Sequence, residues 1–155
     1  MGSALACGTG GYARGTGYGE RIECFAPDSP TAADLRAQGY AGSLVVGAYQ
    51  SQLSTPEVYA AFDQIGAGEG DANHLQKAAV SLHPRSGQAI DAALKAGASH
   101  AFVSGSGPSV LVFTPTPAIR QAVIEAWKQD SCVDRIIAAS APAVPSVTRH
   151  GDAIQ

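Results

Sequence analysis

The chain has 155 residues, which fits one domain of ordinary size, and we expect a single domain over residues 1–155. Its formal net charge is −3 and its 10 Lys and Arg residues are scattered, which argues against a nucleic-acid-binding surface. No apolar run approaches the roughly 18 residues of a membrane span, and the N-terminus lacks the pattern of a signal peptide. Three unclustered cysteines predict neither a disulfide framework nor a zinc site, so we expect a soluble, cytoplasmic protein.

Glycine is dense in residues 2–20, where Ala-Cys-Gly-Thr-Gly at residues 6–10 is followed by Ala-Arg-Gly-Thr-Gly at residues 13–17. Two copies at so short a spacing indicate a duplicated loop and not a solenoid, whose repeats have roughly 20–50 residues. Residues 8–13 match the pattern GxGxxA. A dinucleotide-binding fingerprint needs a helix directly after it, and more glycine follows here, so we predict a loop without a dinucleotide site.

The next segment reads as a connection followed by a strand. Residues 26–42 contain two prolines and two glycines, with a short helix expected over residues 31–38. The β-rich run at residues 43–49 is bounded by turn-forming residues, which predicts a buried strand.

A helix is predicted over residues 53–65, directly after that strand. Its start can be read in two ways: Ser54 and Glu57 have the spacing of a capping box, and Thr55 before Pro56 has the pattern of an N-cap followed by a first-turn proline. Both readings begin the helix at this point.

The rest of the chain alternates helical and strand patterns. We predict helices over residues 72–82, 86–96 and 117–128, and strands over residues 99–103, 109–114 and 133–139. From residue 43 the order is therefore β, helices, β, β, α, β. This is the split βαβ arrangement of a ferredoxin-like antiparallel sheet with helices on one face, so the predicted fold class is α+β. Trp127 falls on the apolar stripe of the last helix and is expected in the core.

Residues 103–110, Val-Ser-Gly-Ser-Gly-Pro-Ser-Val, predict a tight glycine turn between two strands. Such a turn exposes backbone N–H groups that a charged oxygen could approach, and a plain structural hairpin is the alternative reading. The Walker A pattern GxxxxGK[ST] is absent from the sequence, which excludes a P-loop nucleoside triphosphatase.

These two motifs carry a resemblance to a known family. The run at residues 103–109 resembles the third signature motif of the GHMP kinases, which are ATP-dependent small-molecule kinases. Leu-Ser-Thr-Pro-Glu-Val-Tyr at residues 53–59 resembles the branch that phosphorylates a cytidine diphosphate-linked methylerythritol in non-mevalonate isoprenoid biosynthesis. Weaker matches keep the same order, at residues 2–6, 15–20, 73–76 and 138–142. The resemblance covers nearly the whole chain but only the C-terminal half of the family pattern.

The resemblance implies a substrate-binding site at the start of the predicted helix. Thr55, Pro56 and Tyr59 match the family positions that line the cytidine pocket, with the aromatic ring stacked on the base. Stacking of this kind contributes on the order of 1–3 kcal/mol per base. The alternative for Tyr59 is a boundary residue that covers the core with its hydroxyl in water.

The resemblance also implies what this chain lacks. Gly105, Ser106 and Gly107 match the turn that supports the family's phosphate loop, but the loop itself and the Lys-containing strand have no counterpart here. We therefore expect the N-terminal ATP-binding domain to be absent from this chain, whether by truncation or in a natural fragment, and no catalytic residue to be present. ATP and Mg²⁺ would serve the full-length enzyme, and none is expected bound to this chain alone.

Two alternatives remain open. Another GHMP branch, of the homoserine or mevalonate type, would keep the glycine turn without the Ser-Thr-Pro-Glu-Val-Tyr helix start. A non-catalytic ferredoxin-like module would use the turn only structurally, and an uncovered apolar face would allow self-association. The four histidines lack metal-ligand spacing, so no metal site is expected.

Overall fold

The computed structural model describes residues 12–17, 20–69 and 72–143. The GxGxxA match and the first copy of the duplicated loop lie mostly or wholly outside these residues, as does the weak family match at residues 2–6.

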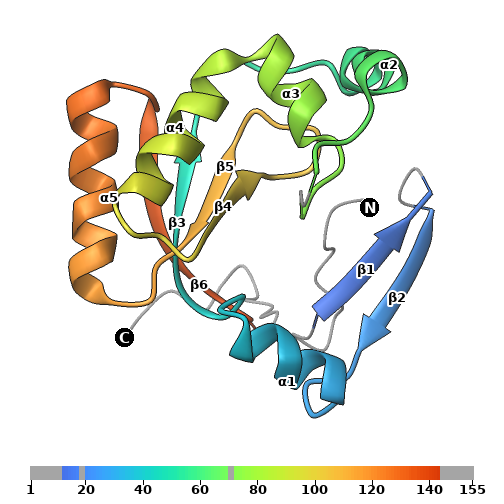
Figure 1. The fold of residues 1–155 in the computed structure, drawn as a ribbon, viewed down its shortest axis with the longest axis vertical. Coiled ribbons are helices and arrows are strands. Elements are labelled where there is room, and N and C mark those ends of the chain that lie inside the picture. Colours follow the sequence, from blue (N-terminus) through green and yellow to red (C-terminus); the bar gives the residue numbers. More distant parts are fainter. Residues whose placement is uncertain (1–11, 18–19, 70–71, 144–155) are drawn as a thin grey trace, which may run out of the picture.

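The described residues form two sheets and five helices (Figure 1). The elements in chain order are β1 (Tyr12–Thr16), β2 (Arg21–Phe25), α1 (Pro30–Ala37), β3 (Gly42–Ala48), α2 (Thr55–Ile65), α3 (Gln76–Leu82), α4 (Pro84–Lys95), β4 (His100–Val103), β5 (Val110–Phe113), α5 (Pro117–Asp130) and β6 (Arg135–Ala141).

The main sheet has four strands in the order β4-β5-β3-β6, and every neighbouring pair is antiparallel. The first strand of the unit, β3, lies between the third, β5, and the last, β6. This is the strand order of the split βαβ arrangement, so the ferredoxin-like α+β prediction is confirmed. Two of the three pairings join segments far apart in sequence, which places β3 at the centre of the fold.

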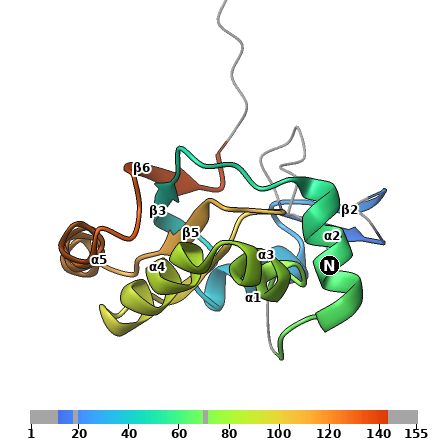
Figure 2. The same cartoon turned by 90° about the horizontal axis from the view of Figure 1, so that it is seen from above.

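Helices α4 and α5 cover one face of this sheet, and α2 lies to the side, against α3 (Figure 2). Strand side chains alternate between the two faces, so opposite residues such as Val45 and Val112 share a face. On the helix side the strand valines have no exposed surface: Val45, Val103, Val110 and Val112. A side chain at Gly47 on β3 would meet Val133 at 2.8 Å and the Trp127 ring at 3.1 Å, so glycine makes room for the indole.

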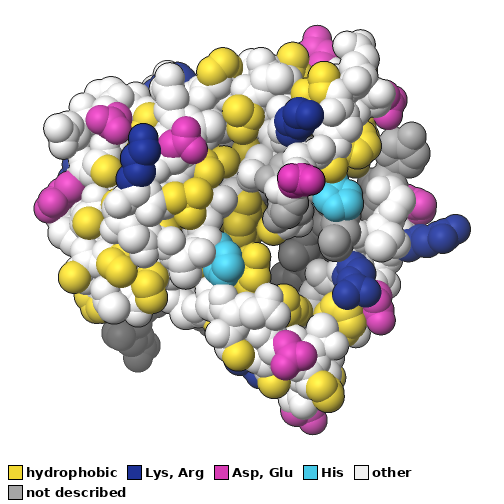
Figure 3. All heavy atoms as spheres, in the orientation of Figure 1, with side chains coloured by type: hydrophobic (Ala, Val, Ile, Leu, Met, Phe, Trp, Pro, Cys, Tyr) yellow, Lys and Arg dark blue, Asp and Glu magenta, His cyan; other side chains and the backbone are white. Residues whose placement is uncertain are grey.

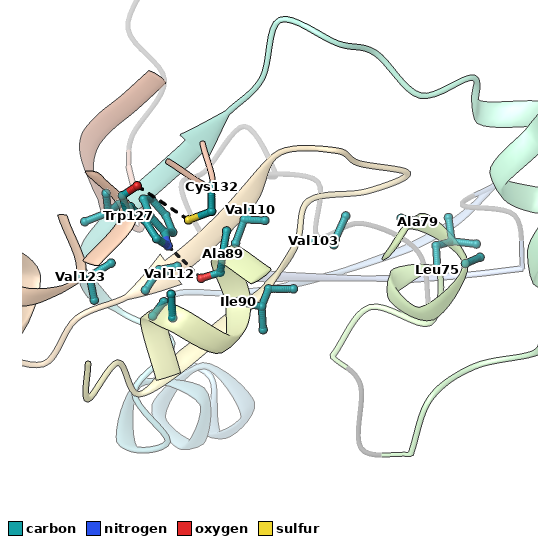
Figure 4. Packing of buried hydrophobic residues seen from close by; sticks show 14 of the residues in the cluster. Leu75, Ala79, Ala89, Ile90, Val103, Val110, Val112, Val123, Trp127 and Cys132 are labelled. Carbon is teal, nitrogen blue, oxygen red and sulfur yellow. Dashed lines mark hydrogen bonds between the residues drawn. The ribbon is translucent and has the colours of Figure 1, made fainter. Parts of the chain in front are cut away.

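The core is organised around Trp127, which is fully buried as the sequence predicts (Figure 4). Its indole N–H donates to the backbone oxygen of Ala89 on α4 at 2.8 Å. The bond satisfies the only polar atom of the ring, so the indole can be buried without a desolvation penalty and ties α5 to α4.

Helix boundaries follow local capping. The Thr116 hydroxyl accepts from the N–H of Ile119 at 3.2 Å, and Pro117 opens α5 behind it. Helix α3 begins at Gln76, later than the predicted residue 72. The cause is Asn73, whose side-chain oxygen accepts from the N–H of Leu75 at 3.1 Å and whose backbone oxygen accepts from Gln76 at 2.9 Å, which forms a turn before the helix.

Strands β1 and β2 form a separate antiparallel hairpin, so the prediction of a loop is wrong for residues 12–16. Arg14 lies opposite Glu23 at 3.7 Å and over the Phe25 ring at 5.6 Å. These cross-strand partners stabilise a glycine-containing strand that its own sequence pattern does not indicate.

The described cysteines differ in their chemical state. Cys24 is disulfide-bonded, which corrects the expectation of no disulfide, whereas Cys132 is a buried free thiol.

Acidic and basic side chains are interspersed on the face seen in Figure 3, in keeping with the scattered Lys and Arg residues of the sequence. Over the described ranges, no helix is long and apolar enough to cross a membrane.

Candidate functional site

Helix α2 begins at Thr55, with Ser54 at the N-cap position and proline in the first turn. Ser54 makes no side-chain capping bond, so the capping box that its spacing allows is not formed. Thr55 and Pro56 are exposed, while Val58 turns fully into the core. Tyr59 is half-buried and packs against the core cluster, and it follows Thr55 by about one helical turn, on the same side of the helix.

The glycine turn between β4 and β5 is confirmed as a tight turn. Gly105 and Gly107 have φ of 59° and 83°, in the left-handed region that favours glycine. The N–H of Gly107 donates to the Ser104 oxygen at 2.9 Å, and the N–H of Ser104 donates to Ser109 at 2.8 Å. A side chain at Gly107 would approach Val103 at 3.0 Å, so packing as well as backbone conformation requires glycine there.

The two motifs meet directly. The Thr55 Oγ1 atom lies 2.9 Å from Ser106 Oγ, a hydrogen bond between residues 51 positions apart. The start of α2 and the tip of the glycine turn therefore share one surface, on which Pro56 and Tyr59 also lie within the first two turns of the helix. The structure thus brings together the residues of the two motifs that the sequence analysis assigned to substrate binding and to phosphate-loop support.

Asn73 is hydrogen-bonded to the backbone of the glycine turn. Its side-chain N–H groups donate to the backbone oxygens of Val103 at 2.8 Å and of Gly105 at 2.7 Å. Asn73 is only 6% exposed, and all of its polar atoms are paired, including the oxygen that accepts from Leu75. The sequence analysis gave this residue no role, because the acceptors of its side-chain N–H groups lie 30 or more residues away.

Two further side chains fix the ends of the turn. The Gln76 Oε1 atom accepts from the N–H of Val103 at 3.0 Å, before the turn. The Ser86 hydroxyl, which is fully buried on α4, donates to the backbone oxygen of Pro108 at 2.6 Å, after the turn. Side chains of the α3–α4 region therefore bond to the residues before the turn, within it and after it.

A polar cluster lies beside Ser86. Burial raises the pKa of Tyr49 to about 12, and its hydroxyl donates to the Arg85 oxygen at 3.2 Å. The Arg85 guanidinium lies 2.8 Å from Asp134 and, with the N–H of Gln50 at 2.9 Å, holds the pKa of that carboxyl below its usual range. Burial, with a contribution from Arg85, lowers the pKa of His83, so its imidazole is neutral at pH 7.

The residues of the candidate site lie at or near the surface: Thr55 and Pro56 are exposed, and Tyr59 and Ser106 are half-buried. Two surface hollows, of about 490 and 220 Å³, lie elsewhere, one between α5 and β6 and one beside Tyr40 and β4. Neither is lined by the α2 start or by the glycine turn. Among the residues that the structure describes, no group of three His, Cys, Asp or Glu could hold a metal ion.

A model of a known protein family matches part of this chain. The family model described as GHMP kinases C terminal matches residues 55–134, a span that runs from the start of α2 through the glycine turn to the polar cluster.

Two curated relatives are closely similar in sequence. The 4-diphosphocytidyl-2-C-methyl-D-erythritol kinase of Bifidobacterium adolescentis is 67% identical over 141 residues, covering 91% of this chain and 46% of that protein. The protein of the same name from Bifidobacterium longum subsp. infantis is 62% identical, covering 91% of this chain and 45% of its own length. The chain therefore spans about half the length of the curated relatives it matches.

The fold has a counterpart among solved structures. A crystal structure of 4-(cytidine 5'-diphospho)-2C-methyl-D-erythritol kinase superimposes with a TM-score of 0.60 at 21% identity, covering 84% of this chain and 50% of that one. At this identity the likeness concerns the fold alone, while the family model and the two Bifidobacterium relatives concern the sequence. Together they show that this chain belongs to the GHMP kinase family and corresponds to its C-terminal domain.

Proposed function

We propose that this chain is the substrate-side domain of an ATP-dependent kinase that phosphorylates 4-diphosphocytidyl-2-C-methyl-D-erythritol in non-mevalonate isoprenoid biosynthesis. In that reaction the γ-phosphoryl group of ATP goes to a hydroxyl of the methylerythritol part. The observation that carries the proposal is the 2.9 Å contact between Thr55 and Ser106, because it joins the two motifs into one surface in a chain whose relatives at 62–67% identity bear that kinase name.

Each part of this surface has a role in the proposal. Thr55 and Pro56 border the cytidine, and the exposed part of Tyr59 stacks on the base. Gly105, Ser106 and Gly107 support a phosphate loop. We propose that this loop belongs to a separate N-terminal ATP-binding domain and that residues 1–155 form a single domain facing it. The exposure of Thr55 and Pro56 suits a site that a second domain completes.

We propose that ATP and Mg²⁺ are held outside this chain. Residues 12–17, 20–69 and 72–143 offer no cluster of three metal-ligating side chains, and the sequence has no Walker A loop. We therefore assign both groups to the proposed ATP-binding domain and derive no step of the reaction through them in this chain. Its contribution is to bind and orient the cytidine end of the substrate.

Calorimetry with CDP tests the proposal. We expect CDP to bind the chain, UDP to bind more weakly, and Tyr59→Ala to weaken CDP binding roughly 5- to 150-fold, which corresponds to about 1–3 kcal/mol of stacking. Tyr59→Phe keeps the ring and serves as the matched control, so its affinity should stay within about twofold of the wild type.

Three results would count against the cytidine site. No binding of CDP, equal binding of CDP and UDP, or an unchanged affinity in Tyr59→Ala would each remove its support. Retained fold with no nucleotide binding would favour the non-catalytic module.

We further propose that the sheet face opposite α4 and α5 mediates self-association. Val46 on β3 lies between Leu111 on β5 and Ile137 on β6, and Ile137 is 38% exposed. Light scattering should show a concentration-dependent dimer that Ile137→Glu abolishes. Ile22→Glu, at the exposed Ile22 of β2, is the matched control and should leave the dimer intact. A monomer at every concentration contradicts the proposal.

We also propose a cytoplasmic location, because a kinase that uses ATP works where ATP is supplied.

A further inference from the structure

Three hydrogen bonds in series connect the segment before α2 to the glycine turn. Ser51 Oγ lies 3.1 Å from His83 Nε2, and His83 Nδ1 lies 2.9 Å from Ser86 Oγ. The Ser86 hydroxyl in turn lies 2.6 Å from the backbone oxygen of Pro108. The series begins at an exposed residue of the β3–α2 connection and ends inside the fold, where Ser86 is fully buried.

The direction of each bond follows from what its atoms can do. A backbone oxygen only accepts, so the single hydroxyl proton of Ser86 is directed at Pro108. Ser86 Oγ must then accept from His83, which requires the proton of the imidazole to be on Nδ1. The unprotonated Nε2 of that tautomer accepts from the Ser51 hydroxyl.

The surroundings of the imidazole favour this neutral form. The Tyr49 ring meets it edge-on, with centroids 4.5 Å apart and planes at 71°. The charged groups in the same cluster are Arg85 and Asp134, and they pair with each other at 2.8 Å. Burial and the nearby Arg85 lower the pKa of His83, which opposes protonation of Nε2.

The β3–α2 connection and the glycine turn are joined twice, once by this series of hydrogen bonds and once by the Thr55–Ser106 contact, so that the two connections form a closed ring. Ser51 lies four residues before Thr55 in the chain, and Ser106 lies two residues before Pro108. One side of the ring is the exposed contact at the candidate site, and the opposite side is the imidazole. The imidazole link and the contact at the site therefore join the same two segments of the chain.

We propose that His83 is a positioning residue which, as the Nδ1-protonated imidazole, sets the separation between the β3–α2 connection and the glycine turn. Its effect on the turn follows from the hydrogen bonds alone. Its effect on cytidine binding rests on the proposed function. Groups held in place by hydrogen bonds of this kind keep a site near its binding geometry before the ligand arrives.

The test compares His83→Ala with His83→Gln, whose amide can both donate and accept. Long-range ¹H–¹⁵N spectra of the wild-type chain should show the His83 proton on Nδ1. Amide hydrogen exchange should be about tenfold faster at Gly107 in His83→Ala and return to within about threefold of wild type in His83→Gln. Exchange at Val123, inside α5, should not change. His100→Gln, a histidine at the far end of β4, is the matched control and should leave Gly107 unaffected.

Each result decides the proposal. A proton on Nε2, or unchanged exchange at Gly107 in His83→Ala, overturns it. Equal acceleration at Gly107 and Val123 also overturns it, because that pattern indicates a loss of global stability and not of local positioning. If His83→Ala does not fold, Ser51→Ala replaces it, since this side chain is exposed, and it should speed exchange at Gly107 about threefold.

Binding of CDP separates this proposal from the previous one. If wild-type chain binds CDP, His83→Ala should weaken the affinity about tenfold and His83→Gln should restore most of it. If wild-type chain binds no CDP, the proposed function fails, while exchange at Gly107 still decides the positioning role.

Discussion

The glycine turn is held by side chains of the α3–α4 region, of which Asn73 and Ser86 are buried, whereas the start of α2 has an exposed first turn and no side-chain cap on its N-terminus. Asn73, Gln76 and Ser86 bond to the backbone of the turn and its flanks. From the other side, one exposed hydroxyl contact connects Thr55 to Ser106.

This difference separates a preformed part of the site from an adaptable one. Backbone atoms with several buried partners have one conformation, and a substitution there should cost folding stability. At the exposed start of α2, the first backbone N–H groups have no side-chain cap, so a substitution there should change the folding stability little. These groups remain available to a ligand. Substitutions in the turn should therefore act on folding, and substitutions at the α2 start should act on binding.

Gly107→Ala should produce the largest effect. It places a side chain at a φ of 83° and 3.0 Å from Val103, so we expect a loss of about 4 kcal/mol in the free energy of unfolding, measured with urea. The matched control is Gly42→Ala, where φ is 96° and nothing lies within 4 Å. Its loss should be about 1–2 kcal/mol, from the backbone alone. Equal losses in the two variants would show that packing around the turn contributes nothing.

Asn73→Ala should follow, with a loss of about 3 kcal/mol, because the backbone oxygens of Val103 and Gly105 lose their shared donor. Asn73→Asp sharpens the test: it keeps the oxygen that accepts from Leu75 but replaces the donor by a second acceptor. It should be at least as unstable. Gln64→Ala, at an exposed position of α2, is the control and should change the free energy of unfolding by less than about 0.5 kcal/mol.

Thr55→Val should have the smallest effect on stability. It removes only the exposed hydroxyl contact with Ser106, so the free energy of unfolding should change by less than about 0.5 kcal/mol in the same urea titration. A loss comparable with that of Asn73→Ala would mean that the α2 start is as firmly held as the turn, and the contrast between the two regions would disappear.

Local patterns predicted most of the sheet-and-helix unit. The stripe that contains Trp127 located α5, and the β-rich run at residues 43–49 located β3 to within one residue at each end. Such segments are stabilised by the periodic burial of their own side chains, which a sequence displays directly. The α+β prediction followed from their order.

Long-range partners account for what the sequence did not predict. The hairpin of β1 and β2 depends on cross-strand pairs such as Arg14 with Glu23, and the late start of α3 depends on the polar contacts of Asn73. The residues of the candidate site were found by resemblance to a family, but their contact at Ser106 joins positions 51 apart. No periodicity or spacing rule reaches across that separation.

The buried Trp127 is an intrinsic fluorescence probe of folding. It is the one tryptophan of the sequence, it has no exposed surface, and its indole N–H is bonded to Ala89 across α4 and α5. Intrinsic fluorescence therefore follows the solvation of a single point in the main core. A red shift of the emission marks the opening of the α4–α5 layer, whereas fraying of the β1–β2 hairpin or movement at the start of α2 leaves the emission unchanged. Unfolding curves from this signal and from circular dichroism should separate wherever those outer elements melt first.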